Sequence, residues 1–156
     1  IPVYSTGKGK IHEEEASIAA RIAMYYHRKK GDTFTENSLG IITPFRAQIM
    51  EIRKRISSEC SKKIVVDTVE RFQGSERDNI IISFALSNPT MLSSVTSVMH
   101  INNATIDRKL NVAITRARQQ LIIIGNPDIL CKEGLFAELL STMEWINPTA
   151  LSEKEL

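Results

Sequence analysis

The chain has 156 residues, 42% of them hydrophobic and 24% charged, which is typical of one folded domain large enough to bury a core. There are 20 Lys and Arg residues and 18 Asp and Glu, so the net charge of +2 excludes an argument for a nucleic-acid partner from bulk charge alone. The two cysteines, Cys60 and Cys131, lie far apart with no ligand spacing around them, which excludes a disulfide framework and a zinc motif.

No run of the sequence is long and apolar enough to span a bilayer, and no signal-peptide pattern is present. We therefore expect an intracellular protein that does not act at a membrane. The sequence begins at Ile1 rather than at a methionine, and we expect it to be a piece of a longer protein.

Short runs rich in Val and Ile predict the strands. They are nearly continuous rather than alternating, which is typical of strands covered on both faces in a parallel sheet. The predicted strands are 39–43, 64–67, 79–84 and 121–125, and helical spacing of apolar residues predicts helices over 12–30, 46–58, 107–118 and 133–145. Strands that alternate with helices indicate an α/β fold with a mostly parallel sheet and helices on both faces.

Two segments do not fit this alternation. Residues 86–105 are rich in Ser, Thr and Asn and are too long for an ordinary connection, so they are either functional or disordered, and we expect a mobile surface loop. We expect residues 1–147 to form a single domain and residues 148–156 to form a frayed tail.

Polar residues follow the first two predicted strands. Thr43, Pro44 and Phe45 come after the first strand, and Thr68 comes after the second. In open parallel sheets ligands bind at the carboxyl ends of the strands, so these residues are candidates for a binding site.

The stretch 72–78, FQGSERD, is a further candidate that we read with the same group. Gln73 and Glu76 supply an amide and an acceptor, and Gly74 lets the backbone approach a ligand closely. The alternative is a polar connection that leads into the next strand.

Two arginines stand directly before the last predicted strand, in the sequence Thr-Arg-Ala-Arg. On an ordinary helix Arg116 and Arg118 would belong to the solvated face. Beside a buried strand their freedom is limited, and a fixed guanidinium there can reach a phosphate on a neighbouring surface.

Residues 6–10, TGKGK, look like a phosphate-binding loop but lack the GxxxxGK(S/T) spacing and a preceding long strand. We therefore expect a flexible lead-in to the first helix. No other segment supplies a Walker A lysine, and no predicted strand ends in the paired acids that hold magnesium.

Taken in order, these motifs resemble the second RecA-like domain of superfamily 1 helicases, of the type found in RNA-decay and helicase-nuclease enzymes. The resemblance spans nearly the whole chain and implies a three-layer RecA-like fold. It rests on 40–48 (GIITPFRAQ, like GIITPYxxQ), 66–78 (VDTVERFQGSERD, like motif V), 110–118 and 121–126 (LNVAITRAR and LIIIGN, like motif VI and its strand) and, more weakly, 12–16 (like NxxEA, with His12 in place of Asn).

For the nucleotide, the resemblance implies that Arg116 is the arginine finger that stabilises charge on the γ-phosphate during attack by water. Arg118 would support the motif through a salt bridge or hydrogen bond. Glu76 would reach the ribose or γ-phosphate side of the nucleotide, with Gln73 and Gly74 shaping the approach.

For the nucleic acid, the resemblance implies that the hydroxyl of Thr68 binds the backbone and that Thr43, Pro44 and Phe45 line the single-strand channel. Phe45 stands where the family usually has Tyr, so a hydroxyl contact is lost and stacking is kept.

The family's ATPase site lies between two RecA-like domains. The resemblance therefore implies a C-terminal motor domain of an ATP-dependent helicase, inactive alone, with ATP and Mg²⁺ bound mainly by a first RecA-like domain of the same polypeptide. Its track would be single-stranded DNA or RNA. The alternative is a catalytically silent RecA-like module that binds nucleic acid or has a regulatory or assembly role.

Overall fold

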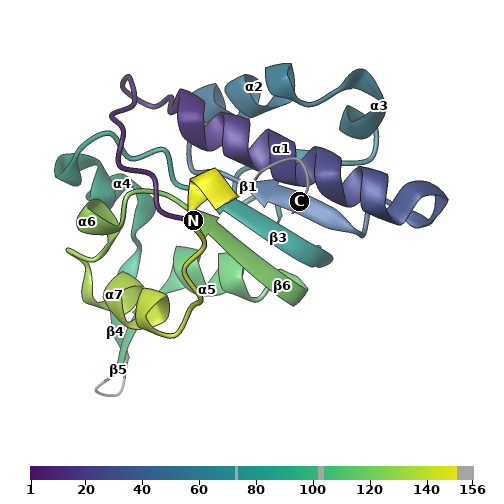
Figure 1. Ribbon diagram of the computed structural model, residues 1–156. Coiled ribbons are helices and arrows are strands. Elements are labelled where there is room, and N and C mark those ends of the chain that lie inside the picture. Colours follow the sequence, from purple (N-terminus) through teal and green to yellow (C-terminus); the bar gives the residue numbers. More distant parts are fainter. Residues whose placement is uncertain (73, 102–103, 151–156) are drawn as a thin grey trace.

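A parallel four-stranded sheet with helices on both faces forms the centre of the molecule in the computed structural model, which describes residues 1–72, 74–101 and 104–150 (Figure 1). The strand order is β2-β1-β3-β6, and every neighbouring pair is parallel. The strands are β1 Leu39–Ile42, β2 Val65–Asp67, β3 Arg77–Ser83 and β6 Ala117–Ile124. The predicted α/β, RecA-like fold is confirmed.

The strands are apolar on both faces because a helical layer covers each face. Ile81 of β3 packs into one core with α1 and α2, and its neighbours Ile80 and Ile82 pack into the other. All three isoleucines are at most 2% exposed, and burying each stabilises the fold by about 1.5–3 kcal/mol.

The two layers of helices are α1, α2 and α3 on one face, and α4, α5, α6 and α7 on the other (Figure 1). The predicted first helix is confirmed, with acidic residues in its first turn and basic residues in its last. The helices are α1 Glu13–Lys30, α2 Arg46–Arg55, α3 Ser58–Ser61, α4 Leu92–Val95, α5 Arg108–Ile114, α6 Pro127–Leu130 and α7 Gly134–Ser141, with 3₁₀ turns at η1 Gly31–Thr33, η2 Pro89–Met91 and η3 Pro148–Ala150.

Three predicted helices are shorter than expected. The helix predicted over 46–58 is divided into α2 and α3 by an extended residue, Ile56. The helix predicted over 107–118 ends at Ile114. The residues from Ala117 onward belong to β6 instead, because Ala117 pairs with Arg77 of β3. The helix predicted over 133–145 ends at Ser141.

The expectation of a mobile loop over 86–105 is wrong. The segment holds α4 and an antiparallel hairpin of β4 Val98–Ile101 and β5 Ala104–Asp107. Leu86 and Val95 are buried in the second core, and the carboxylate of Asp107 caps α5 by accepting from the backbone N–H of Lys109 at 2.9 Å. Within the segment, the Asn88 side chain caps η2 by accepting from the backbone N–H of Thr90 at 3.1 Å, so this polar residue is a cap.

The prediction of a single domain over 1–147 stays a prediction. Residues 148–150 form the turn η3, and the rest of the predicted tail lies outside the described residues. Of the helices that the structure describes, none has the length and apolar character needed to cross a membrane.

Candidate functional site

The sheet has two edges, and the predicted site residues divide between them. Thr43 and Thr68 follow β1 and β2 at what we call the carboxyl edge, whereas Glu76 and Arg116 precede β3 and β6 at the amino edge. The prediction that stretch 72–78 lies with the residues of the carboxyl edge is wrong. The chain leaves β2 and must return to the opposite end of the sheet before a parallel β3 can begin, so the stretch lies where β3 starts.

The turn at the amino edge is tight. The backbone N–H of Ser75 donates to the Phe72 carbonyl at 3.0 Å, and Gly74 has φ +81°. A Cβ at Gly74 would meet nothing within 4 Å beyond its chain neighbours, so glycine is required here by backbone conformation and not by close packing. Gln73 lies outside the described residues.

The carboxylate of Glu76 is held by an arginine. Arg118 Nε donates to Glu76 Oε2 at 3.1 Å, and Arg118 Nη1 lies 4.0 Å from Asp78 Oδ1. Lys30 Nζ at the end of α1 donates to the other oxygen of Asp78 at 3.3 Å. The salt bridge expected of Arg118 is therefore confirmed. Since the side chains of Glu76 and Arg118 are both 51% exposed, this pair adds little stability and is free to rearrange.

Arg116 lies at the same edge and is held differently. Its Nε donates to the Val112 carbonyl at 3.0 Å and its Nη2 to Thr115 Oγ1 at 3.3 Å, so the guanidinium caps the C-terminus of α5. Its backbone carbonyl accepts from the N–H of Arg77 at 2.9 Å, which fixes it beside the start of β3. Among the described residues no carboxylate forms an ion pair with Arg116, so its charge is available to a phosphate.

The residues at the carboxyl edge differ in how far solvent reaches them. Thr43 is fully buried, and its hydroxyl has no hydrogen-bond partner in the described part of the chain. Phe45 is 6% exposed and lies beneath Lys10, whose Nζ is 5.6 Å from the ring centroid. Pro44 and Thr68 are partly exposed. Of these residues, Pro44 and Thr68 are the ones that solvent reaches, and the Thr68 side chain is hydrogen-bonded to the Glu70 carboxylate.

Sequence reasoning missed a buried polar network behind this edge. The carboxylate of Glu15 accepts from Ser83 Oγ at 2.8 Å and from the N–H of Ala85 at 2.9 Å. Gln48 Nε2 in turn donates to Ser83 Oγ at 3.1 Å and to the His12 carbonyl at 3.0 Å. The network ties the starts of α1 and α2 to the end of β3.

Burial raises the pKa of the Glu15 carboxyl to about 7, against contributions from the hydrogen bonds and from His12 that favour its ionised form. His12, which replaces the usual Asn, caps α1: its Nδ1 accepts from the Glu15 N–H at 3.4 Å. His12 therefore serves as the N-cap of α1, although the family usually has Asn at this position. The sequence contains both halves of this network, since Glu15 lies in segment 12–16 and Gln48 ends segment 40–48, but it does not show that they meet.

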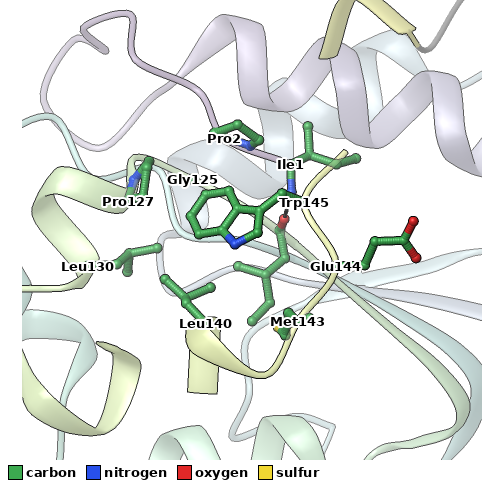
Figure 2. Close-up of a pocket in the computed structure, with 10 residues that line it drawn as sticks. Ile1, Pro2, Gly125, Pro127, Leu130, Leu140, Met143, Glu144 and Trp145 are labelled. Carbon is green, nitrogen blue, oxygen red and sulfur yellow. Dashed lines mark hydrogen bonds between the residues drawn. The ribbon is translucent and has the colours of Figure 1, made fainter. Parts of the chain in front are cut away.

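An apolar hollow lies at the carboxyl end of β6, away from the residues discussed above. Figure 2 shows the Trp145 indole ring among the side chains of Pro2, Leu130 and Leu140. The hollow offers almost no polar side chain to a phosphate. Among the residues that the structure describes, no three His, Cys, Asp or Glu side chains gather as metal ligands. The polar chemistry of the described chain is therefore at the two edges.

Comparison with known proteins identifies the family of the chain. A family described as "AAA domain" matches residues 4–128, which is most of the chain. The chain belongs to this family, in its superfamily 1 helicase branch. The match contains the motifs at both edges of the sheet.

The relatives named below are two helicases and a regulator of nonsense transcripts. The chain is 37% identical over 116 residues to the DNA polymerase alpha-associated DNA helicase A of Saccharomyces cerevisiae, covering 74% of this chain and 16% of that protein. It is 34% identical over 145 residues to Regulator of nonsense transcripts 1 of Dictyostelium discoideum, covering 89% of this chain and 10% of that protein. It is 32% identical over 126 residues to the mouse RNA helicase Mov10l1, covering 81% of this chain and 10% of that protein.

The chain thus spans 10% to 16% of the length of these relatives. It belongs to the RNA-decay type of superfamily 1 helicase domain.

Proposed function

We propose that the chain is the C-terminal motor domain of an ATP-dependent helicase that moves along single-stranded DNA or RNA. The observation that carries the proposal is Arg116, an arginine without a carboxylate partner in the described residues, held at the amino edge by the end of α5. A companion domain of the same polypeptide holds the triphosphate, and Arg116 closes over its γ-phosphate.

Closure requires the Arg116 guanidinium to leave the Val112 carbonyl for a phosphate oxygen. This exchange is inexpensive, because a partly exposed cap at a helix C-terminus contributes only about 0.3–1 kcal/mol. The Glu76 carboxylate accepts a hydrogen bond from a hydroxyl of the ribose. Arg118 then releases Glu76 but keeps its contact with Asp78, and it stays within reach of the same nucleotide. Gln73 and Gly74 shape the turn that approaches it.

At the carboxyl edge, Thr68 donates to the backbone of the strand, and Pro44 packs against sugar or base, with the buried Phe45 beside it. Thr43 supports this surface from below, since its backbone N–H donates to the Asp67 carbonyl at 3.1 Å. The two functions use opposite edges of one rigid sheet, so closure at the nucleotide can move the grip on the strand.

The chain alone does not hydrolyse ATP in this proposal. ATP and Mg²⁺ are bound mainly by the companion domain. The bound Mg²⁺ supplies charge neutralisation at the phosphates, while this chain supplies Arg116 and Glu76.

A pair of variants of the full-length protein tests the division between the edges. Arg116→Ala should lower the maximal rate of ATP hydrolysis and leave binding of a labelled single strand without nucleotide unchanged. Thr68→Ala should weaken that binding several-fold and leave the maximal rate near wild type at saturating strand. Arg28→Ala, an exposed arginine of α1, is the matched control for lost charge. Equal effects of Arg116→Ala and Thr68→Ala on both measurements would contradict the proposal and favour a silent module.

A further inference from the structure

The TGKGK segment is not the flexible lead-in that the sequence predicts. The backbone N–H of Lys8 donates to the Ile11 carbonyl at 2.7 Å, and the N–H of Ile11 donates back to Lys8 at 3.1 Å. The two residues between them form a tight turn, and Gly9 adopts φ +59° at its first position. The segment is a short hairpin with a defined conformation.

The hairpin is fixed to the body of the protein. Ser87, which follows β3, donates from Oγ to the Gly9 carbonyl at 2.8 Å. A Cβ at Gly7 would lie 2.5 Å from the Ile11 carbonyl oxygen and 2.8 Å from Ser87 Oγ, so only glycine fits there. Nε2 of the buried His12 ring lies 2.8 Å from the Ser5 carbonyl and secures the chain ahead of the turn. Figure 1 shows this dark-purple lead-in at the end of the sheet where β1 and β3 finish.

The turn presents two cations to solvent. Lys8 and Lys10 are both exposed, and within the described residues neither ammonium pairs with a carboxylate. By contrast, Lys30 and Lys109 each form an ion pair, at 3.3 and 3.7 Å. The net charge of the whole chain is only +2. The two lysines on this turn are therefore a local concentration of positive charge and do not reflect a general excess.

The nearby acids are engaged elsewhere. Glu13 in the first turn of α1 lies 3.9 Å from Arg55, and the Glu14 carboxylate accepts from Ser5 Oγ. Both carboxylates keep their negative charge in these contacts, but among the described residues neither forms an ion pair with Lys8 or Lys10, so the two ammonium groups are available to an external anion.

The residues next to the turn indicate which kind of anion binds there. Lys10 Nζ stands 5.6 Å from the centroid of the Phe45 ring, the aromatic residue of the proposed track, and Ser87 marks the end of the neighbouring strand β3. Thr68, Phe45 and Lys10 thus follow the sheet order β2, β1, β3 along one edge. The backbone of a strand suits this row, because the Thr68 hydroxyl and the Lys10 ammonium can both contact its phosphates while the buried Phe45 ring lies beneath Lys10.

We propose that the turn Lys8–Ile11 is a phosphate clamp, in which Lys8 and Lys10 bind consecutive backbone phosphates of the single strand beside Phe45. This inference deepens the proposed function and rests on it. It adds two lysines from outside segment 40–48, and it extends the track from the end of β1 to the end of β3.

The full-length protein with Lys8→Ala and Lys10→Ala together tests the clamp. The matched control is Lys62→Ala with Lys63→Ala, two exposed lysines that precede β2 at the amino edge. Binding of a labelled oligonucleotide without nucleotide is followed by fluorescence anisotropy between 50 and 300 mM salt. Two lost phosphate contacts should weaken binding on the order of tenfold near 0.1 M salt and reduce the slope of log K against log salt by about 1.4.

The control pair should bind like wild type. If the Lys8 and Lys10 variant also does, while Thr68→Ala weakens binding, the clamp is refuted and the proposed track stands. If wild type binds no strand, both proposals fall. If a polyglutamate peptide of equal length displaces the strand from wild type as well as unlabelled strand does, the turn recognises acidic protein and the clamp is again refuted.

Discussion

Glu15 makes the stability of the chain depend on pH in a direction opposite to that of most carboxylates. It is fully buried, and one of its oxygens, Oε1, has no hydrogen-bond partner among the described residues. Burial raises its pKa from 4.5 to about 7, a difference that corresponds to about 3 kcal/mol between the two protonation states.

The sign follows from proton uptake. Between pH 4.5 and 7 the folded chain keeps a proton on Glu15 that the unfolded chain has lost. The stabilisation from this proton is complete below pH 4.5 and is lost as pH rises through 7. From pH 5 to pH 8, Glu15 should therefore lower the free energy of unfolding by about 2 kcal/mol.

The variant Glu15→Gln isolates this contribution. Its amide oxygen keeps the bonds from Ser83 and Ala85, and its NH₂ takes the place of the unpartnered Oε1 without titrating. The free energy of unfolding is measured in urea at pH 5, 6, 7 and 8. At pH 5 the variant should lie within about 1 kcal/mol of wild type. Between pH 5 and pH 8 the difference between them should shift by about 2 kcal/mol in favour of the variant. Glu13→Gln, at an exposed position of the same helix, should run parallel to wild type. Parallel curves for Glu15→Gln would refute the reasoning.

Two predictions concern packing and use urea unfolding near neutral pH. Gly40→Ala places a Cβ 2.7 Å from the buried ring of Phe72 and should lower the free energy of unfolding by about 1–3 kcal/mol. The control Gly134→Ala, whose Cβ would have nothing within 4 Å, should change it by less than about 1 kcal/mol. Equal effects of the two substitutions would contradict the close approach at Gly40. Phe136→Ala removes a 1% exposed ring that meets Phe84 edge-on at a centroid distance of 5.2 Å, and should cost about 3–5 kcal/mol, so a loss below 1 kcal/mol would mean that the second core does not depend on it.

Strand positions were predictable because the buried runs are long enough to stand out. Ile80, Ile81 and Ile82 read as a covered strand from sequence alone, and the structure confirms it. The end of helix 107–118 was not predictable, because Ala117 joins the sheet through its pairing with Arg77, a contact between distant parts of the chain.

The site was predictable in its residues but not in its layout. The Thr-Arg-Ala-Arg sequence stands directly before a predicted parallel strand, which already indicates the amino edge. The sequence does not show that Arg118 meets Glu76 and Asp78 there, because this contact depends on the pairing of β3 with β6. The turn at Lys8 was misread for a related reason. Its order comes from Ser87 and His12, which the sequence does not place beside it.

The central claim is that Arg116 acts on a triphosphate held by a companion domain. Single-strand-stimulated ATP hydrolysis by the full-length protein, wild type against Arg116→Ala, tests it most directly, with nucleotide binding measured alongside. We expect the turnover number to fall on the order of a thousandfold while nucleotide binding is largely kept. An unchanged turnover number would contradict the account.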